Sequence, residues 1–216
     1  MILKNLKSIF VLIGVLSIAA ISTNSVFSSQ AVVSDNEFST GTWQIEPPAT
    51  ARVVINEVYY DVAPNKGGDG AVANPDEWIE LYNAGDADVN LKDWTIADNT
   101  TTRTINANHI IAAGSYALIA KDSSTWSLYW SVPSGVEIIN LGQSIGNGLA
   151  NAGDRVILTD DLGNLVDQMS YGSDAFAFSP ACINVLEGHS LERSPAGFDT
   201  GSAADFVDQS TPTPGS

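Results

Sequence analysis

The most constraining feature of this sequence is the regular alternation of side chains in the stretch DEWIELYN. Ile79 and Leu81 fall on one face of an extended chain, and Trp78, Glu80 and Tyr82 fall on the other. A period of two residues is the period of a β-strand, so the stretch is predicted to be a strand that buries Ile79 and Leu81. The opposite face is predicted to be exposed.

Short strands of the same kind recur along the chain, separated by turns that contain Gly, Asn and Asp. The clearest are Arg52–Tyr60, Leu91–Asp98, Arg155–Asp160, Leu165–Tyr171 and His189–Ser194. Residues 121–132 break the pattern and are predicted to form one or two helical turns carrying Trp126 and Trp130. About eight or nine short strands with almost no helix predict an all-β fold, in which two antiparallel sheets pack face to face.

Three blocks of the sequence carry a likeness to a known family. They are Val54–Val58 with Tyr60 and Asp61, Glu77–Asn83 with Trp94–Asp98, and Gly188–Arg193 with Thr211–Gly215. In order and spacing these blocks resemble the lamin-tail domain, the sandwich found in nuclear lamins and in many exported bacterial and archaeal proteins. The resemblance runs from about Ala51 to the C-terminus. It implies an immunoglobulin-like β-sandwich that serves as an accessory module on secreted or surface proteins.

Residues 1–31 are predicted to be a targeting segment rather than part of the fold. Lys4 and Lys7 give it a positive start, an apolar run follows, and Ser29 and Ala31 occupy the −3 and −1 places of a cleavage site. We interpret the segment as a signal peptide or an uncleaved helical membrane anchor. Both interpretations predict that the rest of the chain is secreted or displayed at the cell surface.

Residues 32–50 are predicted to be a linker, because Pro47 and Pro48 favour extended backbone. Within it, Val33–Trp43 is similar to the Ser- and Asp-rich stretch that follows the signal peptide in exported β-sandwich proteins of the camelysin and TasA kind. The globular domain is predicted to span residues 51–216 and to end in a polar tail.

The charge of the chain limits its partners. There are 9 Lys and Arg against 25 Asp and Glu, a formal net charge of −16, and without Lys4 and Lys7 of the leader 7 cations remain against 25 acids, a net charge of −18. Nucleic-acid affinity depends on cations that neutralise phosphates, so no nucleic-acid partner is expected. Membrane contact is expected only through an uncleaved leader. The expected partner is a protein or a polymer of the cell envelope. The single cysteine, Cys182, is predicted to be buried and inert.

Glu57 and Glu80 are candidates for paired catalytic carboxylates, because adjacent strands can place them at the separation that a glycosidase needs. The alternative is that these acids are solvated or pair with cations such as Arg52, Lys92 or Arg103. Hydrolysis is therefore kept as an alternative function, and the favoured interpretation contains no catalytic residue.

The acidic residues around the Gly-rich stretch after the first strand are candidate metal ligands: Asp61, Asp69, Asp76 and Glu77. Calcium prefers carboxylate and carbonyl oxygens and is the only candidate cofactor. The spacing is not that of an EF-hand, so a simple acidic loop remains the alternative.

Aromatic side chains on the outward face and in the short helix suggest a binding surface, made of Trp78, Glu80, Tyr82, Trp126 and Tyr129. Such side chains stack on sugars or anchor protein partners. The sequence thus predicts a non-catalytic exported module for adhesion, scaffolding or envelope interaction. The alternatives are a calcium- or carbohydrate-binding surface protein and a hydrolase.

Overall fold

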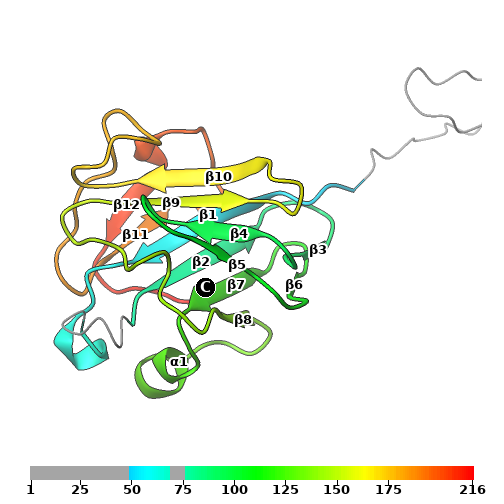
Figure 1. Cartoon of the computed structure of the whole chain (residues 1–216), viewed down its shortest axis with the longest axis horizontal. Helices are drawn as coiled ribbons and strands as arrows, with labels where there is room; N and C mark the ends of the chain where they lie inside the picture. The colour runs from blue at the N-terminus through cyan, green and yellow to red at the C-terminus, as the bar shows by residue number, and fades with distance from the viewer. Residues whose placement is uncertain (1–48, 69–75) are drawn as a thin grey trace, which may run out of the picture. The chain divides into compact units, whose positions relative to one another are not determined.

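Two β-sheets face each other and enclose the core of the protein, as Figure 1 shows. The computed structural model describes residues 49–68 and 76–216, which all belong to one unit, Pro47–Ser216. The predicted leader, the Val33–Trp43 stretch and Asp69 lie outside the described residues. Among the described residues no helix has the length and apolar character needed to cross a bilayer.

The larger sheet has six strands in the order β12-β11-β1-β2-β7-β8. They are β1 (Val53–Tyr59), β2 (Trp78–Asn83), β7 (Tyr116–Ala120), β8 (Glu137–Asn140), β11 (Ser190–Arg193) and β12 (Phe206–Gln209). The smaller sheet has the order β10-β9-β4-β5. Its strands are β4 (Thr95–Ala97), β5 (Thr102–Thr104), β9 (Arg155–Thr159) and β10 (Leu165–Ser170).

The remaining elements are short: a two-stranded ribbon of β3 (Val89–Asn90) and β6 (Ile110–Ile111), the helix α1 (Ser124–Tyr129), and the 3₁₀ turns η1 (Pro64–Lys66) and η2 (Ala203–Asp205). The predicted all-β immunoglobulin-like sandwich is confirmed, and the described residues contain twelve strands rather than eight or nine. All strand pairs are antiparallel except β7 with β8, which is parallel. The short helix also forms where it was predicted, at α1.

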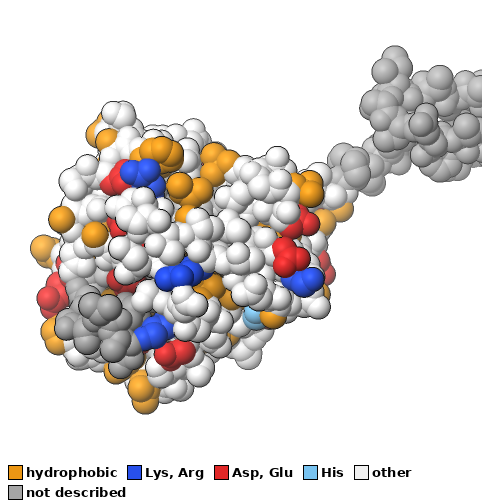
Figure 2. Space-filling view, in the orientation of Figure 1, with side chains coloured by type: hydrophobic (Ala, Val, Ile, Leu, Met, Phe, Trp, Pro, Cys, Tyr) orange, Lys and Arg blue, Asp and Glu red, His pale blue; other side chains and the backbone are white. Residues whose placement is uncertain are grey.

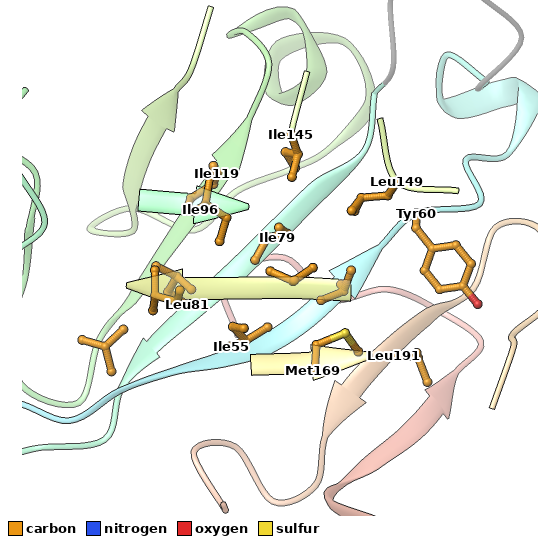
Figure 3. Packing of buried hydrophobic residues seen from close by; sticks show 14 of the residues in the cluster. Ile55, Tyr60, Ile79, Leu81, Ile96, Ile119, Ile145, Leu149, Met169 and Leu191 are labelled. Carbon is orange, nitrogen blue, oxygen red and sulfur yellow. The ribbon is translucent and has the colours of Figure 1, made fainter. Parts of the chain in front are cut away.

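The core lies between the two sheets (Figure 3). Ile79 and Leu81 of β2 are fully buried there, as their alternation predicts. Ile96 of β4 and Met169 of β10 belong to the same cluster from the opposite sheet. Burying such side chains stabilises the fold by roughly 1.5–3 kcal/mol each.

Arg193, the last residue of β11, ties the two sheets together. Its guanidinium donates hydrogen bonds to Asp167 of β10 at 2.9 and 3.1 Å and to Asp205 at 3.3 Å. Its Nε donates to the carbonyl of Ile55 at 2.8 Å, and the Ile55 N–H donates to Asp167 at 2.7 Å. The β1 and β10 ladders both shift register close to this point, after Ile55 and after Leu165. Arg193 and Asp167 therefore satisfy the Ile55 backbone groups where the ladder is interrupted.

Candidate functional site

Three glutamates form a row across the face of the six-stranded sheet that points away from the core. Glu57 of β1 pairs in register with Glu80 of β2 on one side and with Glu192 of β11 on the other. Directly opposed residues on neighbouring strands have Cβ atoms about 4.5–5.5 Å apart. Glu57 and Glu80 are fully buried, and Glu192 is half-buried.

Each buried carboxylate accepts hydrogen bonds from the C-terminal segment. Glu57 accepts from the Thr213 N–H at 3.2 and 3.3 Å, and also from the Ser190 hydroxyl. Glu80 accepts from the Gly215 N–H at 2.6 Å and from the Asn56 side-chain amide at 2.8 Å. No Lys or Arg of the described residues forms an ion pair with either carboxylate.

The C-terminal segment, residues 211–215, covers this row of acids. Figure 1 places the end of the chain against the six-stranded sheet, beside β2 and β7. Gly215 has φ +93°, and a Cβ added to it would lie 2.8 Å from Pro133 and 2.9 Å from Val136. The segment is therefore held on one side by carboxylates and on the other by the loop before β8.

Burial changes the ionisation of the pair. It raises the pKa of Glu57 to about 7, although the bonds from Ser190 and Thr213 oppose the shift. It raises the pKa of Glu80 to about 8, and the nearby charges of Glu57 and Glu192 add to the rise. In the absence of a cation, burial thus makes both carboxyls hold their protons more tightly than a solvated glutamate does.

The predicted exposure of this face is wrong. Trp78 and Glu80 do lie on the face of β2 opposite Ile79 and Leu81, as predicted. Both are nevertheless fully buried, because residues 211–215 and α1 cover that face. Glycoside hydrolysis needs two carboxyls that open on a cleft for substrate. Glu57 and Glu80 instead contact their own chain, so their geometry does not favour the hydrolase alternative.

The cations suggested as partners for these acids bind elsewhere. Arg52 donates to the carbonyl of Gly197 at 3.0 Å, and Lys92 pairs with its neighbour Asp93. Arg103 donates to backbone carbonyls at 3.1 Å and at 2.5 Å, those of Ser144 and Gly146. Their positive charges therefore stabilise loops and leave the buried acid pair without a counter-ion.

The tryptophans predicted for a binding surface form a second small core. Trp78 stacks on Tyr59 at 5.5 Å between ring centroids, and Trp130 meets both rings edge-on at 5.3 and 5.6 Å. Trp126 lies 6.1 Å from Trp78 and is buried. The ammonium of Lys66 lies 3.9 Å from the Trp130 ring centroid, which closes the cluster with a cation–π contact. Predicting Trp126 as part of an exposed surface is therefore wrong.

Tyr82 and Tyr129 are the more accessible members of the predicted surface. Tyr82 is half-buried, with its ring 4.7 Å from that of Tyr116. Tyr129, at the end of α1, is also half-buried, and its carbonyl accepts a bond from Lys66 at 2.6 Å. They lie at separate places, so the five predicted residues do not make one exposed platform.

The predicted metal ligands are engaged with the fold where they are described. Asp61 accepts from Asn151 at 2.8 Å, Asp76 accepts from Thr125 at 2.9 Å, and Glu77 accepts from the Leu149 N–H at 3.0 Å. Within residues 49–68 and 76–216 the structure has no group of three or more potential metal ligands. Calcium binding with Asp69 stays a prediction.

Comparison with known protein families matches residues 46–173 to the Lamin Tail Domain. The chain belongs to the lamin tail domain family. The lamin tail domain is an immunoglobulin-like domain, generally a binding or structural module rather than an enzyme. The matched residues end shortly after β10. Strands β11 and β12 and the C-terminal segment, residues 211–215, follow them in the chain. No curated protein matches the chain.

This lamin tail domain has an apolar loop that no pattern in the sequence predicts. Between β10 and β11, Phe176, Ile183 and Leu186 are 60%, 61% and 70% exposed. Figure 2 shows small groups of hydrophobic side chains among polar ones, including a group at the upper left, where Figure 1 draws this part of the chain. In the same loop Cys182 is buried as predicted, and burial raises the pKa of its thiol to about 12. The loop was missed because its apolar residues follow neither a helix nor a strand period.

Proposed function

We propose that this lamin tail domain is a non-catalytic exported module that binds a protein or a polymer of the cell envelope. Membership of the family supports binding over catalysis. Export is supported by the leader-like sequence of residues 1–31. Nucleic acid is disfavoured as the partner by the net charge of −16.

The observation that carries the proposal is the anchored loop, residues 173–188. Its backbone is fixed by bonds from the Cys182 N–H to the Ser170 carbonyl at 2.9 Å and from the Val185 N–H to the Tyr60 hydroxyl at 2.8 Å. The Phe178 N–H donates to the Ser170 hydroxyl at 3.2 Å. A fixed backbone that exposes large apolar side chains loses little entropy on binding, which suits an interaction surface.

An open hollow beside this loop adds polar groups. It has a volume of about 480 Å³ and is lined by Arg155, Asp174 and Phe176 among others. Arg155 pairs with Asp174 at 2.7 Å and lies 4.0 Å from the Phe176 ring centroid. Arginine and aromatic side chains are the residues that most often dominate binding energy in protein interfaces.

The test compares two substitutions in the loop with one elsewhere. The double variant Phe176→Ser/Leu186→Ser should bind envelope fractions with an affinity at least about tenfold lower, as measured by co-sedimentation of the purified chain. The reason is that interface anchors contribute roughly 2 kcal/mol or more each. Leu162→Ser is the matched control, because Leu162 is 82% exposed at the β9–β10 turn. Equal retention of all three proteins would exclude the loop as the binding surface.

A further inference from the structure

The contact between the C-terminal segment and the acid pair has a feature that a structural clasp does not need. The backbone N–H groups of Thr213 and Gly215 end on Glu57 and Glu80, two carboxyls that can each carry or lose a proton. Neutral acceptors, such as the carbonyls used elsewhere in the fold, would give a clasp that is insensitive to pH. Here the free-energy cost of burying the pair depends on how many protons it holds, because a buried carboxylate costs more than a buried neutral carboxyl.

The ionisable groups around the pair add no positive charge. Glu192 faces it from β11, and Tyr82 and Tyr116 face it from β2 and β7. Residues 211–215 are uncharged, and the loop before β8 contributes Pro133 and Val136. Two ionised carboxylates at this place would be desolvated and would repel each other, with Glu192 as a third negative charge.

We propose that residues 211–215 form a proton-linked clasp, which stays closed while the Glu57–Glu80 pair holds at least one proton and opens when both carboxyls ionise. Opening lets water reach the carboxylates. It also uncovers the outer face of β1 and β2, with the row of three glutamates. This device is separate from the binding loop of residues 173–188.

The direction of the pH effect follows from the closed state. Burial raises the pKa of both groups, to about 7 and about 8, from the ordinary value of 4.5. The bonds from Thr213 and Gly215 favour ionisation but do not cancel the effect of burial. The closed clasp therefore binds protons more tightly than the open one. Its stability is complete below about pH 4.5 and is lost as the pH rises through 7 to 8.

The test is hydrogen exchange of the Thr213 and Gly215 amides in the full chain, corrected for the intrinsic effect of pH. We expect their protection to fall by at least about tenfold between pH 6 and pH 9, since one unit of pKa shift corresponds to a tenfold change. Amides in the β9–β10 hairpin should keep their protection. Constant protection at Thr213 and Gly215 over this range would overturn the proposal.

Two variants separate the pair from other titrating groups. In E57Q/E80Q the protection of Gly215 should no longer depend on pH, whereas Glu192→Gln should leave most of the dependence in place. A full pH dependence in the double variant would overturn the proposal. If the double variant does not fold, carbon-13 NMR titration of the wild-type carboxyls decides the matter, because ordinary titration near pH 4.5 at both glutamates would also overturn it.

Discussion

Two of the sites at which the described residues bury ionisable groups neutralise them in different ways. At the first, Arg193 is fully buried and contacts three acids, Asp167, Asp199 and Asp205. At the second, Glu57 and Glu80 are fully buried with hydrogen-bond donors but without a cation. Burial works to raise the pKa at both sites, and at Asp167 the largest opposing cause is the charge of Arg193.

The difference shows what each site can do. A guanidinium keeps its charge at all ordinary pH values, so the Arg193 site is permanent and suits a joint between sheets. A carboxyl pair can exchange its protons with solvent, so the Glu57–Glu80 site depends on conditions. The first site joins β11 to β10 and β1, whereas the second holds residues 211–215 against the outer face of the larger sheet.

The largest effect is expected from removing the permanent charge. Arg193→Met should lower the free energy of unfolding by about 3–5 kcal/mol, because it leaves the Asp167 carboxylate buried without its partner. Urea denaturation measures the loss. Lys92→Met is the control, since its pair with Asp93 is exposed and should contribute less than about 1 kcal/mol. Similar losses in the two variants would contradict the role of Arg193.

A smaller effect that depends on pH is expected at the acid pair. Ser190→Ala removes the hydroxyl that donates to Glu57. The loss should be about 0.5–1.5 kcal/mol at pH 5, where the acid is neutral, and about 1.5–3 kcal/mol at pH 9, where the bond is to a charge. Denaturation at both pH values gives the comparison. Ser127→Ala, at an exposed position of α1, should have little effect at either pH. A loss at position 190 that is independent of pH would show that Glu57 does not ionise in the folded state.

Alanine substitutions at two glycines separate the cost of crowding a neighbour from the cost of backbone strain at positive φ. Gly215 and Gly163 both have positive φ, +93° and +84°, but only Gly215 has neighbours in the space that a Cβ would fill. Gly163→Ala should therefore cost about 1 kcal/mol from the backbone alone, and Gly215→Ala somewhat more. Thermal unfolding measures both. Equal costs would mean that Pro133 and Val136 move aside without loss.

The smallest expected effect concerns a third way of neutralising acids, by a cation taken from solution. If Asp69 completes a site with Asp61, Asp76 and Glu77, a calcium concentration equal to the Kd should stabilise the chain by about 0.4 kcal/mol. Thermal melting with calcium against chelator is the measurement, and Asp69→Asn is the control. An unchanged melting temperature in the wild type would remove calcium from consideration.

The local pattern predicted the strands well and their surroundings less well. The alternation in β2 assigned Ile79 and Leu81 to the core correctly. It also placed Trp78 and Glu80 together on the opposite face, but the cover over that face comes from residues about 135 positions later in the chain. A period of two residues reports which side chains share a face and contains no information on what lies above it.

Two further misses have the same physical origin. Arg193 lies two residues after Leu191 in β11, so the strand period already placed its side chain on the inward face. Its partner Asp167 is 26 residues away in the sequence. The bonds of Arg193 to the interrupted ladder depend on register shifts in β1 and β10 that the sequence does not show. β12 lies in a stretch that was predicted to be a polar tail. Its place at the sheet edge depends on pairing with β11 rather than on its own composition.

The position of β1 in the middle of the larger sheet determines when the protein can fold. Its contacts with Arg193 and Thr213 join residues separated by 138 and 156 positions. Closing such long loops is slow, and it cannot begin until Arg193 and Thr213 have been synthesised. A strand early in the sequence thus waits for strands late in the sequence before both of its edges are paired. The larger sheet is therefore complete only after β11, β12 and residues 211–215 have joined it.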